Sequence, residues 1–240
     1  MLGFLLARKG VNVTLLEKHT DFFRDFRGDT IHPSTLELIY ELGLLEEFLK
    51  IPHQVMPQLS MIFANSSIRM VDFSHLPVHC PYVAFMPQWD FLNFMAGHGK
   101  KYPNFNLQMG AEVTDLIIEN DTTKGVIAQT AEGQIEIRAN LVVGADGRSS
   151  IVRQKAGLKV NEFGVPIDVL WLHIPKGPEM KEQALGYFKA DKMMVLIDRH
   201  DYFQCGYIIA KGKFEEIKKH GLEAFRADLV SLAPFLGSWD

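Results

Sequence analysis

The chain has 240 residues, 47% of them hydrophobic and 22% charged, a composition typical of one large globular domain or two interleaved ones. A formal net charge of −4 and a pI near 6.1 leave no broad basic surface for phosphate backbones, which argues against nucleic-acid binding. The two cysteines, Cys80 and Cys205, lack CxxC spacing, which argues against a disulfide framework or a four-ligand zinc site and favours a reducing cytoplasm. No apolar run in the sequence approaches the roughly 20 residues that cross a bilayer, so we expect a soluble protein.

The first predicted elements are a helix, a tight turn and a strand. Gly10 is placed where a helix ends in a left-handed residue, and residues 11–17 then alternate toward β-branched and apolar side chains. The strand closes at Glu17. In a nucleotide-binding fold, a carboxylate at that end of a strand can accept the hydroxyl hydrogens of an adenosine ribose. Because acidic residues end many ordinary strands, a simple surface carboxylate is the alternative.

A loop rich in charge, aromatic residues and glycine follows. It contains Arg24, Arg27 and Gly28 ahead of a helix start. A guanidinium group is planar and binds anions with a fork of donors, so this loop suits contact with a phosphate or a flavin ring. A solvated surface loop is the alternative interpretation.

Three further elements are predicted before residue 100. Ser34 and Glu37 form a capping-box pattern, and the apolar spacing predicts a helix over 34–48. Residues 58–73 predict a hairpin, because a polar break divides two apolar stretches. Residues 88–97 have helical spacing and end near glycines.

The second half of the chain is predicted to be mainly β. The predicted elements are a three-stranded meander over 111–119, 124–130 and 134–138, strands near 166–174, 183–189, 193–198 and 202–210, and a helix over 214–232. No Pro/Gly-rich linker separates the β-rich part from the rest of the sequence, so we expect it to pack without a flexible tether.

Between the meander and these later strands lies a run with a cofactor-like pattern. Leu141–Ala145 is continuously apolar, which is typical of a strand buried on both faces of a parallel sheet. Asp146 and Gly147 follow it, and Ser149 is placed to cap a further helix. We expect this strand and the strand that ends at Glu17 to lie in one parallel sheet, with Glu17 and Asp146 at the same edge, where such sheets place ligands. A plain strand-to-helix turn is the alternative.

Two other patterns carry weaker signals. His75, His79 and Cys80 have the types and spacing of metal ligands, but no second cluster supplies the remaining ligands, so we expect a loop and no metal site. The region of Phe188 and Met193–Met194 is interpreted as core in preference to a substrate pocket, although such residues also line pockets for aromatic substrates. No residue is identified as catalytic.

Together these segments resemble the aromatic-ring hydroxylase group of the class A FAD-dependent flavoprotein monooxygenases, a para-hydroxybenzoate hydroxylase-like family. The run over 27–36, Arg-Gly-Asp-Thr-Ile-His-Pro-Ser-Thr-Leu, looks like the family's flavin-contacting arginine loop. Residues 86–88 match the glutamine that the family places beside the FAD, and residues 142–149 match its Asp-Gly motif. Residues 168–175 resemble the strand that enters the substrate domain, so the resemblance covers essentially the whole chain.

The resemblance implies an α/β fold in which a Rossmann-like FAD-binding domain carries an inserted β-rich substrate domain. The FAD-binding part is expected at 1–56 and 82–160, and the β-rich substrate-binding part at 57–81 and 161–240. The family's first strand with its glycine loop and its later Gly-Asp segment are expected to lie outside this sequence, which makes FAD retention by this chain a question for experiment. The residues that the resemblance assigns to FAD are Glu17, Lys18, Arg27, Gln88, Val113, Asp146 and Gly147.

The implied reaction is the hydroxylation of a small aromatic molecule with FAD as cofactor, NAD(P)H as co-substrate and dioxygen as oxidant. Another FAD-dependent oxidoreductase, such as an epoxidase or a dehydrogenase, could use the same scaffold, and a non-catalytic truncated remnant is a further alternative. Trp171 could suggest a flavin halogenase. However, Leu170 and Leu172 stand where that group has paired tryptophans, which argues against halogenation.

Overall fold

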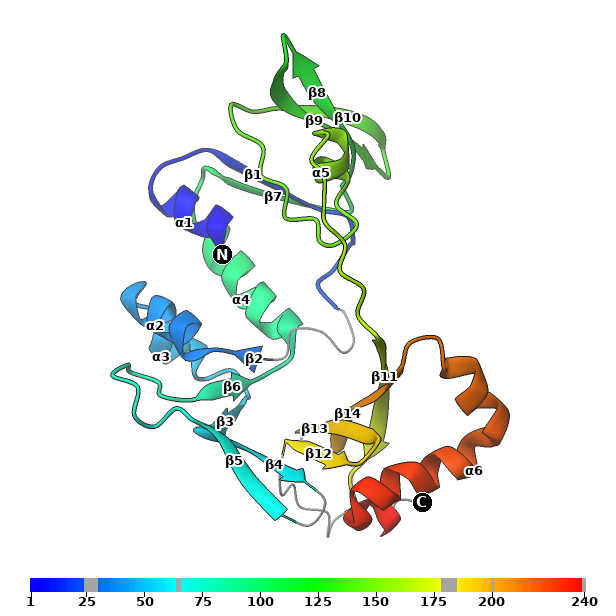
Figure 1. Cartoon of the computed structure of the whole chain (residues 1–240). Coiled ribbons are helices and arrows are strands. Elements are labelled where there is room, and N and C mark those ends of the chain that lie inside the picture. Colours follow the sequence, from blue (N-terminus) through cyan, green and yellow to red (C-terminus); the bar gives the residue numbers. More distant parts are fainter. Residues whose placement is uncertain (24–29, 64–65, 178–184, 200, 239–240) are drawn as a thin grey trace. The chain divides into compact units, whose positions relative to one another are not determined.

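The computed structural model describes all of the chain except residues 24–29, 64–65, 178–184, 200 and 239–240 (Figure 1). The chain divides into two compact units, one formed by Met1–Arg24 and Gln88–Phe163 and the other by Asp25–Pro87 and Gly164–Asp240. The described residues of 30–56 and 82–87, which the sequence assigned to the FAD-binding part, therefore cluster with the second unit. Which unit binds which ligand stays a prediction.

The first unit begins with the predicted helix, turn and strand. Its elements are α1 (Leu2–Arg8), β1 (Val13–Glu17), α4 (Gln88–Gly99) and β7 (Phe105–Met109). Gly10 has a φ of +84° and turns the chain from α1 into β1. β1 and β7 pair in parallel, with Val13 opposite Phe105 at one end. α1 packs on α4, and the ring of Phe4 lies 5.9 Å from that of Tyr102, just after α4. The predicted order of helix, turn and strand is confirmed.

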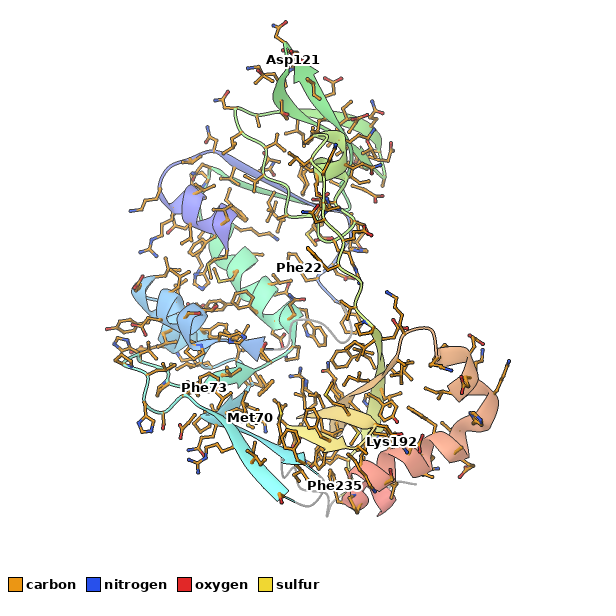
Figure 2. The ribbon with its side chains drawn as sticks, in the orientation of Figure 1. Phe22, Met70, Phe73, Asp121, Lys192 and Phe235 are labelled. Atoms are coloured by element: carbon orange, nitrogen blue, oxygen red, sulfur yellow. The ribbon has the colours of Figure 1, made fainter. Side chains whose placement is uncertain are left out.

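The predicted meander is also confirmed in the first unit. It consists of β8 (Glu112–Glu119), β9 (Thr122–Thr130) and β10 (Gly133–Arg138), paired antiparallel in the order β10-β9-β8. Asp121 lies at the tip of the β8–β9 hairpin with a φ of 57°, a left-handed conformation that Asn and Asp tolerate in tight turns (Figure 2). The short helix α5 (Ile151–Lys155) lies beside β8 (Figure 1).

The strand predicted at Leu141–Ala145 is wrong. Within the described residues this segment joins no ladder, and the parallel sheet of the first unit holds β1 and β7 alone. The side chain of Leu141 is 77% exposed and that of Val143 is 56% exposed. Apolar composition shows that a segment can be buried, but a strand also needs a neighbouring backbone with which to exchange hydrogen bonds. Glu17 and Asp146 therefore do not end two strands of one sheet.

The helix after the Asp-Gly segment starts one residue later than predicted. Its N-cap is Ser150, whose side chain accepts from the backbone N–H of Arg153, whereas Ser149 is exposed. Both serines suit an N-cap by type, so only the path of the loop selects between them. Gly157, with a φ of +68°, follows the end of the helix.

The second unit is built on a six-stranded sheet in the order β11-β14-β13-β12-β4-β5. Its strands are β4 (Gln58–Phe63), β5 (Ser66–Asp72), β11 (Ile167–Pro175), β12 (Gly186–Lys189), β13 (Lys192–Asp198) and β14 (Tyr202–Ala210). All neighbouring pairs are antiparallel except β12 and β4, which pair in parallel. The predicted β4–β5 hairpin and the four later strands are confirmed.

One face of this sheet is covered by α6 (Phe214–Leu232) and the 3-10 helix η1 (Pro234–Ser238) (Figure 1). Met194, Phe203 and Cys205 from the strands pack there with Leu229 and Leu236 from the helices, and all five are at most 1% exposed. Because strand side chains alternate between faces, Met193 points away from this core. None of the helices in the described parts of the chain combines the length and the apolar character that a membrane span requires.

A smaller sheet completes the second unit. It consists of β2 (Thr30–Ile31), β6 (Val83–Phe85) and β3 (Gln54–Met56) in the order β2-β6-β3. The helix predicted over 34–48 is present as two helices, α2 (Pro33–Glu41) and α3 (Leu45–Phe48). Gly43, with a φ of +72°, separates them, because a left-handed residue ends a helix.

The predicted capping box at Ser34 and Glu37 is wrong. The N-cap of α2 is His32, without a side-chain cap bond, and Pro33 occupies the first helical position. Proline fits that position because a helix leaves its first N–H groups without internal partners. The Glu37 carboxylate instead accepts from the backbone N–H of His79 at 3.0 Å and lies 2.9 Å from the Nδ1 atom of the same residue.

Candidate cofactor site

Glu17 lies at the carboxyl end of β1, where the chain that leaves β7 crosses over. Its backbone oxygen accepts from the N–H of Ala111 at 2.9 Å, and the N–H of Gly110 donates to the oxygen of His19 at 2.8 Å. β8 begins one residue after Ala111 and contacts β1. The structure thus brings the end of β1, with Glu17 and Lys18, together with the start of β8, which carries Val113.

The Glu17 side chain is oriented by its own turn. Its Oε1 atom accepts from the backbone N–H of His19 at 2.9 Å, and the side chain is partly exposed. A carboxylate held in this way at the end of a parallel strand can accept hydrogens from vicinal hydroxyls such as those of a ribose. The predicted position of Glu17 at the end of a strand is confirmed, and its role stays a prediction.

Asp146 and Gly147 form the turn that leads into α5. The hydroxyl of Ser150 donates to Oδ1 of Asp146 at 2.5 Å, and the backbone N–H of Val152 donates to Oδ2 at 3.1 Å. Gly147 has a φ of +87°, and apart from its two chain neighbours no atom of the described residues lies within 4 Å of the position that a Cβ would take there. Such a turn is open to the close approach of a ligand, and a side chain at Gly147 would strain the backbone.

The pKa of Asp146 reflects two opposed effects. Partial burial, the largest single effect, raises the pKa of this carboxyl, but the hydrogen bonds from Ser150 and from backbone amides, including that of Val152, together lower it below its usual value. The carboxylate is therefore the stable form at neutral pH.

β8 connects the two halves of the candidate site. Lys155 at the end of α5 pairs with Asp115 at 2.8 Å, two residues along β8 from Val113. α5 also packs closely on the segment before Asp146, because a Cβ at Gly144 would lie 2.9 Å from a methyl carbon of Val152. Glu17 and Asp146 are thus linked through β8, and not through a shared parallel sheet as the sequence predicted.

Two predicted site residues, Gln88 and Arg27, are not part of the group formed by Glu17, Val113 and Asp146. Gln88 is the first residue of α4 and is partly buried, next to Trp89, whose ring lies 4.8 Å from that of Phe23. Burial raises the pKa of Asp90 in the same turn. Arg27 falls within residues 24–29, outside the described residues, so its place in the site is a prediction.

Sequence reasoning missed two residues that shape this unit. Ser150 holds Asp146, but the neighbouring Ser149 is equally suited by type, so the sequence carried no signal to choose between them. The side-chain amide of Asn104 donates to the carbonyl oxygens of Ala7 at 2.9 Å and Val11 at 2.6 Å, which ties the turn between α1 and β1. That contact spans more than 90 residues of sequence, so no local pattern could reveal it.

The second unit carries an open hollow of about 640 Å³. The rings of Phe63 and Phe188 stack there with centroids 4.7 Å apart and planes 14° apart, and Met193 and Ile208 add apolar surface. Met194 is fully buried in the core, as the sequence predicted. For Phe188 and Met193 the core interpretation is wrong, because the alternating strand pattern turns them to the other face, where they line this hollow.

His75, His79 and Cys80 do not form a metal site. In the part of the chain that the structure describes, no group of three His, Cys, Asp or Glu side chains is arranged to hold a metal ion. His79 is instead paired with Glu37, and the ring of Tyr40 stacks on it with centroids 3.4 Å apart. Cys80 is 3% exposed and is a free thiol, like Cys205.

A parallel strand pair that ends in a carboxylate is typical of the dinucleotide-binding type of α/β unit. A family model described as FAD binding domain matches residues 1–234. The chain therefore belongs to the FAD binding domain family, which confirms the resemblance to the class A flavoprotein monooxygenases. The groups present fit part of FAD, because Glu17 supplies a carboxylate of the kind that binds ribose and the Gly147 turn is open to a ligand.

Several known proteins are similar to the chain. The 6-methylpretetramide 4-monooxygenase of Streptomyces rimosus is 24% identical over 234 residues, which cover 97% of this chain and 56% of that protein. The solved structure of p-nitrophenol 4-monooxygenase PnpA from Pseudomonas putida DLL-E4 matches with a TM-score of 0.78 at 20% identity, covering 93% of this chain and 58% of that one.

The myxobacterial chondrochloren halogenase CndH matches with a TM-score of 0.81 at 20% identity, covering 99% of this chain and 56% of that one. These structural matches confirm the predicted α/β fold of an FAD-binding protein with a β-rich part. The chain spans between 56% and 58% of the length of these three proteins.

Proposed function

We propose that this chain is the FAD- and substrate-binding portion of a monooxygenase that uses NAD(P)H and dioxygen to hydroxylate a small aromatic molecule. The observation that carries the proposal is the Glu17 carboxylate at the end of β1, held beside the start of β8, in a chain that matches the FAD binding domain family over residues 1–234. The names of similar proteins, among them a 6-methylpretetramide 4-monooxygenase and a p-nitrophenol 4-monooxygenase, support an aromatic substrate.

The roles of the residues follow from their chemistry. Glu17 accepts the ribose hydroxyl hydrogens, with Lys18 and Val113 beside it at the ends of β1 and β8. Asp146 and Gly147 shape the turn that receives the pyrophosphate. FAD, when bound and reduced by NAD(P)H, supplies the activation of dioxygen that no protein side chain provides.

Two further residues complete the proposed cofactor contacts. Gln88, at the start of α4, contacts the flavin or its ribityl chain. Arg27 positions the flavin ring, because its planar guanidinium can stack on a ring and donate in a fork. Both roles rest on the matched motifs.

The hollow of the second unit supports a flat, apolar substrate. The stacked rings of Phe63 and Phe188 and the side chains of Met193 and Ile208 offer apolar surface, and the volume of about 640 Å³ suits a small molecule. A cytoplasmic setting is part of the proposal and is supported by the two free, buried thiols.

The proposal is tested first by titrating the 240-residue chain with FAD and following flavin fluorescence. We expect saturable binding, because charge-assisted hydrogen bonds of the kind that the Glu17 carboxylate can accept are each worth on the order of 1.5–3 kcal/mol. The absence of saturable binding would contradict the proposal.

The reaction is tested by following NAD(P)H consumption and product formation in the presence of FAD. NAD(P)H consumption that is stimulated by an aromatic compound and yields its hydroxylated product supports the monooxygenase. An epoxide, or an oxidised product without added oxygen, would instead indicate an epoxidase or a dehydrogenase on the same scaffold. Halogenated product in the presence of halide would indicate the activity named for CndH, against which Leu170 and Leu172 argue.

A further inference from the structure

The floor of the hollow in the second unit is a single row of apolar side chains that crosses neighbouring strands. Phe188 of β12 is opposite Phe63 of β4 on one side and Met193 of β13 on the other, and Met193 is opposite Ile208 of β14. All four residues line the hollow. Because neighbouring strands lie about 4.8 Å apart, the row is about 14 Å long. A floor of this length extends well beyond one benzene ring and suits fused planar rings.

The position of the Phe188 ring depends on Gly186, two residues earlier on the same face of β12. A Cβ on Gly186 would stand 3.0 Å from Cε2 of the Phe188 ring and 3.2 Å from Cγ of Met61. Phe188 lines the hollow, whereas its described lining includes neither Gly186 nor Met61, so the ring separates these two residues from the hollow. A side chain at residue 186 would therefore push the ring toward the hollow.

The need for space, and not an unusual backbone, explains the glycine at this position. The φ of Gly186 is outside the left-handed region, so other residues can adopt its conformation. Glycine weakens a strand, and in a sheet it often marks a place where another group approaches closely. Here that group is the ring of Phe188, which stacks on Phe63 with centroids 4.7 Å apart and planes 14° apart. The missing side chain thus lets Phe188 pack beside Phe63 and leaves the row open.

We propose that Gly186 is a specificity-determining residue, which keeps the whole row open so that the hollow takes planar molecules with fused aromatic rings. For the role of the hollow as the substrate site, the inference rests on the proposed function. A molecule with one ring occupies only part of the row. A fused-ring molecule extends along it from Ile208 toward Phe188, and a displaced Phe188 ring would shorten the floor that it needs.

The test is an NMR titration of the 240-residue chain with phenol, which has one ring, and with 2-naphthol, which has two fused rings. The signals followed are the methyl groups of Met193 and Ile208. We expect both compounds to shift these signals and 2-naphthol to bind more tightly. Gly186→Ala should weaken 2-naphthol binding roughly tenfold, the scale of one methylene in an apolar pocket, and phenol binding by less than about twofold.

Two further variants separate this role from a general effect on the sheet. A Cβ on Gly206 would stand 3.1 Å from the ring of Trp171, which is not part of the described lining of the hollow. Gly206→Ala is therefore the matched control, and the affinities for both compounds should be unchanged. Phe188→Leu removes the ring carbon that Gly186→Ala would meet, so in that background Gly186→Ala should leave the ratio of the two affinities unchanged.

The inference is overturned if Gly186→Ala weakens both compounds by the same factor, if its selective effect persists with Phe188→Leu, or if Gly206→Ala reproduces it. It is also overturned if 2-naphthol shifts neither methyl signal. If the chain does not bind FAD while the two compounds behave as expected, the proposed function fails and the role of Gly186 stands. If FAD binds and an aromatic compound is hydroxylated while Gly186→Ala shows no selectivity, only the role of Gly186 fails.

Discussion

Gly99 at the end of α4 lies against Phe105 at the start of β7 so closely that a Cβ on Gly99 would stand 2.7 Å from two carbons of the phenyl ring. Phe105 is 9% exposed, and its ring also lies 3.4 Å from the position that a Cβ on Gly3 of α1 would take. A methyl group at Gly99 must therefore displace a buried ring.

We expect Gly99→Ala to lower the free energy of unfolding by about 1–3 kcal/mol, the usual cost of overpacking a core. Gly97→Ala is the control on the same helix, because beyond the helix's own backbone and the two chain neighbours no atom of the described residues lies within 4 Å of its Cβ position. Alanine should stabilise an exposed helical position by roughly 0.5–1 kcal/mol. Urea unfolding of both variants checks the prediction, and equal effects at the two glycines would contradict it.

The pair of Glu37 and His79 predicts a pH effect on a single carboxyl. The backbone and ring hydrogen bonds from His79 hold the pKa of Glu37 below its usual value. A carboxyl whose pKa is lowered by folding contributes stability above its unfolded pKa, and this contribution is lost as the pH falls through the folded value. We expect His79→Ala to raise the pKa of Glu37 toward its usual value, because the ring bond is lost while the backbone bond remains.

The measurement is an NMR titration of the Glu37 side-chain carbon in the two proteins. Glu119, whose pKa is lowered by its pairing with Arg138, provides an internal control that His79→Ala should leave unchanged. A Glu37 titration that is the same in both proteins would show that the ring of His79 does not act on it.

The thiol of Cys205 should be inert in the folded protein. Its side chain is fully buried beneath α6, and desolvation raises the pKa of Cys205 to about 12. Alkylation requires the thiolate, so we expect iodoacetamide at pH 8 to label Cys205 only after unfolding in guanidinium. Mass spectrometry of the labelled peptide checks this, and rapid labelling of the native chain would contradict the burial.

The raised pKa of Cys205 also makes the stability of the folded protein depend on pH. Because the unfolded chain releases this proton first, stability should fall as the pH rises above the ordinary thiol pKa. Cys205→Ala removes that contribution and should flatten the alkaline limb of a plot of unfolding free energy against pH.

A substitution at Glu17 can separate an effect on FAD binding from an effect on the stability of the fold. Glu17→Gln keeps an oxygen for the N–H of His19 but removes the negative charge. We expect the free energy of unfolding to change by less than about 0.5 kcal/mol, as at most surface positions, while FAD affinity falls roughly tenfold with the loss of charge-assisted bonds. Calorimetric titration with FAD measures the effect, with Glu132→Gln in the exposed turn between β9 and β10 as the control. Unchanged affinity would remove Glu17 from the site.

Local patterns in the sequence were sufficient for most elements. The meander of β8, β9 and β10, the hairpin of β4 and β5, and α6 were predicted because alternation, helical spacing and turn residues act over a few neighbouring positions. The position of Glu17 at the end of β1 followed from the same kind of signal. The resemblance that carried the family assignment also rested on contiguous motifs.

Tertiary structure decided the remainder, since it depends on partners that are distant in sequence. Leu141–Ala145 reads as a strand but has no paired neighbour among the described residues, and a strand forms only with a second backbone. Glu37 fits a capping box by type and spacing, but its carboxylate accepts a hydrogen bond from the backbone N–H of His79, which lies 42 residues away. Ser149 and Ser150 are equally suited by type to donate to Asp146. The path of the loop determines that Ser150 makes the hydrogen bond. Hydrogen-bonding capacity is a property of a residue, but the partner that uses it is set by the fold.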